Sequence, residues 1–231
     1  MIFLQAETMQ AAAEQISPVL TQVVETDNTM NLWEMTLKGG WIMIVLAVLS
    51  ILCFYIFFER LVTYKKAQKN DPSFMDRIRD YVMNGEHKSA INYCRVVGTP
   101  IANMIEKGIE RIGRPSADIR AAVDNAGNLE VARLEKGLSI MATISSGAPM
   151  IGFLGTVLGM VRAFWEMAGA GNNIDITLLA GGIYEAMITT VGGLIVGIIA
   201  MFAYNFLVSR VDSITNQLEA QTLAFMDMIK E

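Results

Sequence analysis

Residues 186–209 read AMITTVGGLIVGIIAMFAYNFLVS and contain no Asp, Glu, Lys or Arg. A helix needs about 20 mostly apolar residues to cross the hydrocarbon core of a bilayer, and this stretch is long enough. Two further stretches, 39–58 and 137–161, are also free of charged residues. Glycine is frequent in the second and third stretches, as it is in membrane helices. The sequence therefore predicts an all-α membrane protein with three transmembrane helices.

The basic residues indicate how the three spans are oriented. Residues 1–37 contain five acids and no Lys or Arg. Basic residues follow the first and third spans directly, at Arg60, Lys65, Lys66 and Arg210. Because positive charge accumulates on the cytoplasmic flanks of membrane helices, we expect the N-terminus outside the cytoplasm and the C-terminus inside it.

These signals divide the chain into seven expected segments. In order they are an outer arm with an interfacial helix, the first span, a cytoplasmic helical domain, the second span, a short outer loop, the third span and a cytoplasmic C-terminal helix. Their expected bounds are 1–38, 39–60, 61–136, 137–166, 167–176, 177–209 and 210–231.

Long cytoplasmic helices are expected to extend spans two and three. Ser116 can cap a helix, and no proline follows it until Pro149, so we expect one unbroken helix from the cytoplasm into span two. Beyond span three, one helical face recurs at steps of three and four, which predicts that this span continues as an amphipathic helix. That face consists of Val211, Ile214, Leu218, Thr222, Phe225 and Ile229. Two such long helical extensions favour an oligomeric helical bundle.

One acidic residue lies inside a predicted span. Glu185 follows the uncharged stretch 176–184, which places it roughly 13 Å below the outer start of span three at ~1.5 Å per residue. An ionisable group at such a depth usually faces the bundle interior and has a function. A carboxyl that exchanges between neutral and charged forms is what a proton relay requires. The structural alternative is a neutral Glu185 bonded to a hydroxyl, or an ion pair with Arg162.

Three threonines are candidates for the same path. Counted inward from the outer ends of spans two and three, Thr156 is as deep as Glu185. Thr189 lies one turn below Glu185 on the same face, whereas Thr190 lies roughly 140° round the helix. Each hydroxyl could instead bond to the backbone of its own helix.

Small residues are spaced for close packing of spans two and three. Glycines four residues apart allow two helices to approach closely, and a proline can kink a helix. The candidates for such packing are Pro149, Gly152, Gly155, Gly159, Gly193 and Gly197.

No enzyme chemistry is recognisable in the sequence. It has no phosphate-binding glycine loop, no Ser/His/Asp set and no cluster with metal-ligand spacing. The two cysteines, Cys53 and Cys94, fall in different segments, so no disulfide is expected. We expect a protein that is not an enzyme and that needs neither a cofactor nor a metal.

Three segments taken together resemble one known family. Residues 148–160 read APMIGFLGTVLGM, residues 182–193 read GIYEAMITTVGG, and residues 203–205 read AYN. The number of spans and the FERL sequence at 58–61 also fit. The chain resembles the ExbB/TolQ/MotA proton-channel family, and within it most closely the ExbB branch.

The resemblance implies a motor in the cytoplasmic (inner) membrane of a two-membraned bacterium. Members form pentamers around a pore that holds ExbD, a single-span partner with a membrane aspartate. Proton flow then drives TonB, which energises outer-membrane receptors. By alignment of the motifs, Glu185 corresponds to the membrane glutamate of the family, and Thr156 and Thr190 correspond to its pore threonines. The outer segments would face the periplasm.

Other functions remain open from the sequence. A TolQ-like subunit would couple the same engine to envelope constriction, and the intramembrane residues do not separate it from an ExbB-like one. A flagellar MotA stator would need four spans. A membrane scaffold without proton conduction is the alternative from another class, but a scaffold has no need of a buried acid such as Glu185.

Overall fold

The computed structural model describes residues 40–68, 73–169 and 176–230. The chain divides into two units, 1–38 and 39–231, and all the described residues belong to the second. The expected outer arm and interfacial helix therefore lie outside the described residues, as does most of the short loop between spans two and three.

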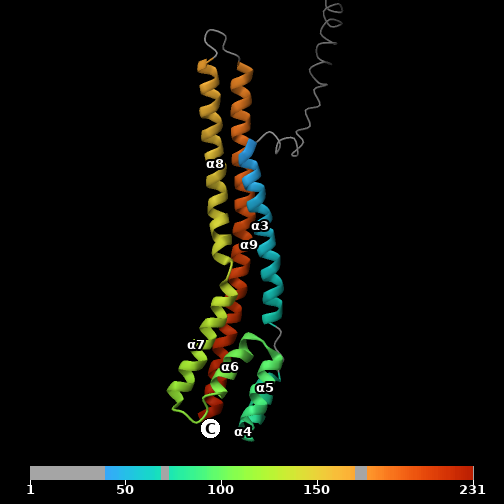
Figure 1. The fold of residues 1–231 in the computed structure, drawn as a ribbon, viewed down its shortest axis with the longest axis vertical. Helices are drawn as coiled ribbons and strands as arrows, with labels where there is room; N and C mark the ends of the chain where they lie inside the picture. The colour runs from blue at the N-terminus through green and yellow to red at the C-terminus, as the bar shows by residue number, and fades with distance from the viewer. Residues whose placement is uncertain (1–39, 69–72, 170–175, 231) are drawn as a thin grey trace, which may run out of the picture. The chain divides into compact units, whose positions relative to one another are not determined.

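Every regular element in the described part of the chain is a helix (Figure 1). The helices are α3 (Gly40–Ala67), α4 (Phe74–Met83), α5 (His87–Val97), α6 (Pro100–Ile109), α7 (Ser116–Glu135), α8 (Leu138–Gly169) and α9 (Ile176–Lys230). Three stretches are long and apolar enough to cross a membrane: α3, the α7–α8 stretch Ser116–Gly169, and Leu179–Ile229 within α9. The all-α class and the number of spans are confirmed.

Helix α9 is the longest described element, and α3, α6, α7 and α8 pack against it. It runs for 55 residues without a break, which confirms that span three continues beyond the membrane segment. Beyond the apolar segment it buries the predicted face, including Val211, Ile214, Leu218 and Phe225, in the hydrophobic core. The C-terminal part of this helix thus belongs to the same hydrophobic core as the membrane-length helices.

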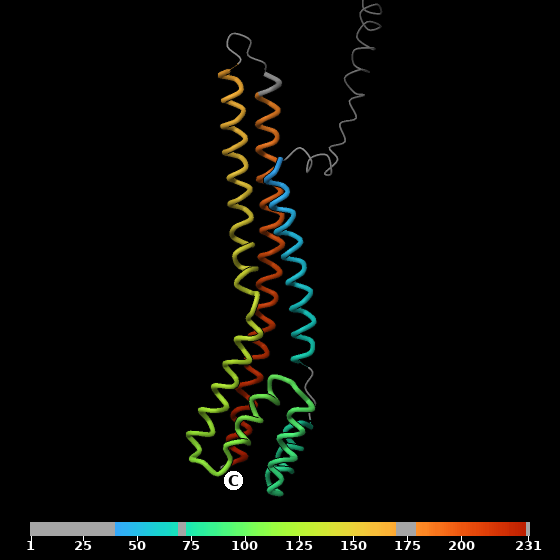
Figure 2. The backbone as a smooth tube through the Cα atoms, viewed as in Figure 1, coloured from blue at the N-terminus to red at the C-terminus, as the bar shows by residue number. Residues whose placement is uncertain are grey.

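Helices α8 and α9 lie side by side, and α3 packs against α9 (Figures 1 and 2). Residues of α3 that face α9 include the buried Leu46 and, farther along, Phe57, whose ring centroid lies 6.3 Å from that of Phe206. Both α8 and α9 extend beyond the start of α3 at the end where they are joined to each other (Figure 1). Because of this offset, the start of α3 lies beside Glu185 rather than beside the first turn of α9.

The expected unbroken helix from the cytoplasm into span two is wrong. Helix α7 ends at Glu135 and α8 begins at Leu138, because Lys136 has φ −54° and ψ 127°, and Gly137 has φ +89°. Glycine adopts that left-handed backbone at little cost, and a residue at positive φ ends the run of α-helical backbone. The expectation of one unbroken helix rested on the absence of proline, which does not exclude a break at glycine.

Short helices lie between α3 and α7 in the chain. Gly98 ends α5 with φ +60°, and the Thr99 hydroxyl then accepts a hydrogen bond from the Ala102 backbone N–H at 3.3 Å, which caps α6. Almost every residue of α6 is buried. Its Gly108 contacts the Phe225 ring of α9, so α6 ties the short helices to the end of the longest one.

Candidate functional site

Two threonine hydroxyls join α8 to α9 within one chain. The hydroxyls of Thr156 and Thr190 hydrogen-bond to each other. Thr190 also donates toward the Gly152 carbonyl oxygen at 3.2 Å, and Thr156 toward the Ala186 carbonyl oxygen at 3.3 Å. The contact of Thr156 with residue 186 agrees with the predicted equal depth of Thr156 and Glu185. The two half-buried hydroxyls thus form a connected pair, in which each oxygen can accept a hydrogen bond and donate one.

Thr189 occupies a different environment from Thr190. It is 2% exposed, and its hydroxyl donates to the Ala186 carbonyl oxygen of its own helix at 2.7 Å. The same hydroxyl lies 3.4 Å from the Gly152 carbonyl oxygen of α8. Thr189 thus matches the alternative in which a membrane threonine bonds back to its own backbone.

The predicted glycines lie where α8 meets α9. A Cβ on Gly193 would come within 2.6 Å of the Ala148 carbonyl oxygen and 2.8 Å of the Gly152 Cα. Gly159 contacts Ala186, Gly155 contacts Thr189, and Gly197 contacts the Pro149 ring, which lies inside α8. These contacts bring the two backbones close enough for the threonines to reach across. The structure brings these glycines to the contact between α8 and α9.

Glu185 precedes Ala186, whose carbonyl oxygen lies 3.3 Å from the Thr156 hydroxyl. It is half-buried, and it forms neither a hydrogen bond nor an ion pair with any residue that the structure describes. Arg162 instead pairs with Glu166 of its own helix, with 3.0 Å between Nε and Oε1. The alternative of a Glu185–Arg162 ion pair is therefore not what the structure has.

The neighbour of the Glu185 carboxyl is the start of α3. Its Oε1 atom lies 2.6 Å from the position that a Cβ on Gly40 would take. By residue count, Glu185 lies about 13 Å below the outer start of span three. In the structure its carboxyl nevertheless lies beside Gly40, the first described residue of span one. Nothing in the pattern of either span pairs Gly40 with Glu185, because the two residues lie on helices far apart in the sequence.

Comparison with known proteins now bears on these residues. Residues 97–220 match the MotA/TolQ/ExbB proton channel family, and this match contains Thr156, Glu185, Thr189 and Thr190. The chain belongs to that family. The matched region excludes α3, so family membership by itself says nothing about Gly40.

Individual relatives agree with this membership. An ExbB homologue of Methanothermobacter thermautotrophicus is 28% identical over 187 residues, which cover 80% of this chain and 66% of that relative. The biopolymer transport protein ExbB of Neisseria meningitidis is 25% identical over 193 residues, 78% of this chain and 86% of that protein. The Tol-Pal system protein TolQ of Haemophilus influenzae is 41% identical over 93 residues, 40% of each chain. This chain is thus a member of the proton-channel family with relatives in both the ExbB and the TolQ branches.

Proposed function

We propose that this chain is the proton-channel subunit of an ExbB-like motor in the cytoplasmic membrane of a bacterium. It would work with an ExbD-like single-span protein and energise a TonB-like protein for outer-membrane transport. The observation that carries the proposal is the Glu185 carboxyl, which has no partner among the described residues and lies in an apolar helix close to the level of two linked threonine hydroxyls. In this arrangement Glu185 takes up and releases protons, and Thr156 and Thr190 support their path.

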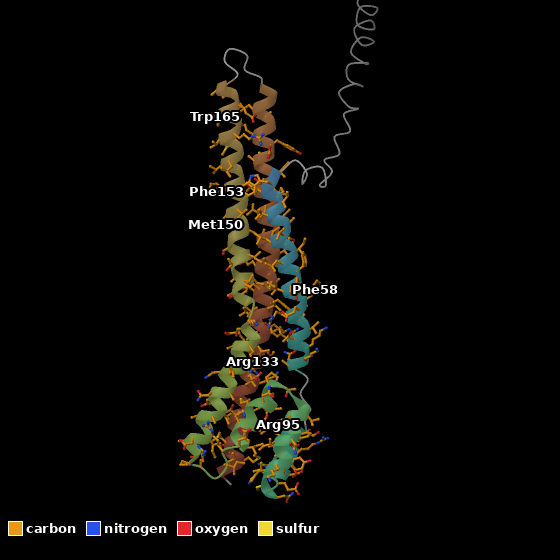
Figure 3. All side chains as sticks on the ribbon, viewed as in Figure 1. Phe58, Arg95, Arg133, Met150, Phe153 and Trp165 are labelled. Atoms are coloured by element: carbon orange, nitrogen blue, oxygen red, sulfur yellow. The ribbon has the colours of Figure 1, made fainter. Side chains whose placement is uncertain are left out.

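The uncovered face of α8 supports an assembly of several copies. Met150, Phe153 and Trp165 point outward from α8 and are 72%, 64% and 80% exposed in the single chain (Figure 3). Apolar side chains on a membrane helix contact either lipid or another helix. A ring of copies, which we propose to be a pentamer, would cover part of this face and leave a central space for the partner's helix.

The test is to remove the ability of Glu185 to ionise. Glu185→Gln keeps the size and hydrogen bonding of the side chain, so the ring should assemble while gradient-dependent uptake of a TonB-type substrate is lost. Glu185→Ala should behave alike, whereas Glu185→Asp should keep part of the activity because it still ionises. Glu166→Gln is the matched control, because this nearby acid is already paired with Arg162. If Glu185→Gln transports like the wild type at matched expression, Glu185 has a structural role only.

A TolQ-like function is the second candidate, favoured by the local identity of this chain to a TolQ protein. The two candidates differ in what the motor drives, so complementation separates them. Restored uptake of a TonB-type substrate in a strain lacking its own ExbB and TolQ supports the ExbB-like function. Restored envelope integrity without uptake supports the TolQ-like one, and restoration of neither supports a scaffold.

A further inference from the structure

The last turn of α7 receives two side chains from the end of α3. The Arg60 Nη1 atom donates a hydrogen bond to the Arg133 carbonyl oxygen at 3.4 Å. One turn further along α3, the Tyr64 hydroxyl donates to the Leu134 carbonyl oxygen at 2.9 Å. Both donors lie in the interior, because 12% of the Arg60 side chain and 2% of Tyr64 are exposed. Side chains of α3 thus bond to two successive carbonyls at the end of α7.

An α-helix that continued through this point would use the same two carbonyls itself. Each helical carbonyl oxygen accepts the N–H of the residue four positions later, so residues 133 and 134 would accept from residues 137 and 138. In the structure the φ of Gly137 is +89°, and α8 begins at Leu138. The N–H groups at the start of a helix have no partner within it. The donors of α3 therefore take the place of N–H groups that a continuous helix would supply.

The local sequence does not require a break at this point. Residues 116–148 contain no proline, and one glycine weakens a helix only modestly. A Cβ on Gly137 would lie 3.5 Å from the Arg60 Nε atom and 3.5 Å from the Ile56 Cγ2 atom, which is ordinary van der Waals contact. There is therefore space for another residue at 137, and only the positive φ favours glycine there.

Charge favours the contact between α3 and α7 as well. The positive guanidinium of Arg60 lies at the C-terminal end of α7, where the helix dipole places partial negative charge. Glu59 lies beside it, with 2.8 Å between Arg60 Nε and Glu59 Oε2. At this end α7 leaves the line of α8 (Figures 1 and 2). The contact and the change of direction therefore occur at the same place in the fold.

We propose that Arg60 and Tyr64 form a latch that holds the break between α7 and α8, and that the two helices become one continuous helix when the latch opens. Helix α7 packs against α6 and α9, whereas α8 carries Thr156. The latch thus sets the direction of the α7 extension relative to the span that carries Thr156. A segment with two hydrogen-bonded arrangements is the kind of element that switches between discrete states.

The test is hydrogen exchange of the backbone amides of residues 137–140, followed by mass spectrometry of the assembled protein in detergent. Arg60→Met combined with Tyr64→Phe removes both donors and changes side-chain size little. When the continuous helix forms, these amides gain helical partners, so their exchange should slow by roughly tenfold, the combined size of two hydrogen bonds. A contact that only stabilises the fold gives the opposite result, because its loss makes local opening easier and exchange faster.

Gly137→Ala tests the other arrangement with both donors in place. Alanine disfavours the left-handed backbone and favours the helix, and its methyl group meets no close contact. We expect exchange of the same amides to slow by roughly fivefold, the difference in helix propensity between glycine and alanine.

Two matched variants serve as controls. Lys65→Met combined with Tyr55→Phe removes one positive charge and one hydroxyl from the same helix, but both side chains are exposed. Gly113→Ala places alanine at φ +93°, where nothing described lies within 4 Å of its Cβ. Both controls should keep the wild-type exchange of residues 137–140.

Slower exchange in both test variants, with both controls unchanged, supports the latch. Unchanged or faster exchange in the double variant shows that Arg60 and Tyr64 do not hold the break. Unchanged or faster exchange in Gly137→Ala shows that the continuous helix does not form. If the double variant does not accumulate, Tyr64→Phe alone is measured in its place and judged in the same way. No part of this test depends on proton transport or on Glu185, so its failure would leave the proposed function intact.

Discussion

The hydroxyl of Tyr64 donates a hydrogen bond to the carbonyl oxygen of Leu134, with 2.9 Å between the two oxygen atoms. Tyr64 is 2% exposed and lies near the end of α3, whereas Leu134 lies in the last turn of α7. The carbonyls of that turn have no partner within the helix. The bond thus fixes the end of α7 immediately before Gly137 changes the direction of the chain.

Tyr64→Phe should weaken this junction. The substitution leaves a buried carbonyl without its donor, which costs about 1–3 kcal/mol of folding free energy. We expect a lower midpoint of thermal unfolding in detergent, followed by circular dichroism. Tyr55→Phe is the control, because Tyr55 lies on the same helix and is 68% exposed. Equal midpoints for the two variants would show that the Tyr64 bond contributes nothing.

Gly193→Ala should separate α8 from α9. The new methyl group would meet the Ala148 carbonyl oxygen and the Gly152 Cα, and neither backbone atom can move independently of its helix. Overpacking of this kind costs about 1–3 kcal/mol, and the larger Gly193→Leu should prevent normal assembly. Size-exclusion chromatography of the purified complex measures this loss. Gly147→Ala, which meets nothing described within 4 Å, should assemble normally.

Cys94 should be almost inert toward thiol reagents in the folded protein. Burial raises the pKa of its thiol from 9.0 to about 12, with a smaller contribution from the negative charge of Glu106. Since the thiolate is the reactive form, we expect modification at pH 8 to be roughly a thousandfold slower than for an exposed cysteine. Lys88→Cys provides the exposed reference, and mass spectrometry separates the two sites. Similar rates at both positions would contradict the burial of Cys94.

The raised pKa of Cys94 also predicts how the free energy of unfolding depends on pH. The folded state favours the neutral thiol, so this contribution is fully present below the unfolded pKa of 9.0 and is lost as the pH rises toward about 12. Chemical unfolding at pH 8 and pH 10.5 should show a decrease for the wild type that is smaller in Cys94→Ala. An equal decrease in both proteins would assign the effect to other groups.

Membrane orientation is testable with single cysteines. We expect position 172, outside the described residues, to face the periplasm and Lys88 to face the cytoplasm, because basic residues flank the cytoplasmic ends of the spans. In a Cys53→Ala, Cys94→Ala background, a membrane-impermeant reagent should label Asn172→Cys in intact cells. It should label Lys88→Cys only after the cells are opened, and labelling of Lys88→Cys in intact cells would overturn the orientation.

The sequence by itself determined the number of helices that can cross a membrane and the residues at which two of them touch. A long uncharged stretch in a membrane forms a helix, because a helix satisfies every backbone polar group within the segment. The spacing of the glycines predicted a contact between two helices at Gly159, Gly193 and Gly197, because residues four apart share a helix face. In the structure each of the three lies against the neighbouring helix of the α8–α9 pair. Local periodicity was sufficient for these inferences.

Only the tertiary structure decided which residues surround Glu185. The offset between α3 and the longer pair α8 and α9 depends on how three helices pack, and no periodicity within one helix specifies it. Gly40 and Glu185 are therefore neighbours in space although they are far apart in the chain. The break at Gly137 is also a feature of the tertiary structure, because a glycine fits either a helix or a left-handed turn. Here the turn accompanies the hydrogen bond of Tyr64 to the end of α7.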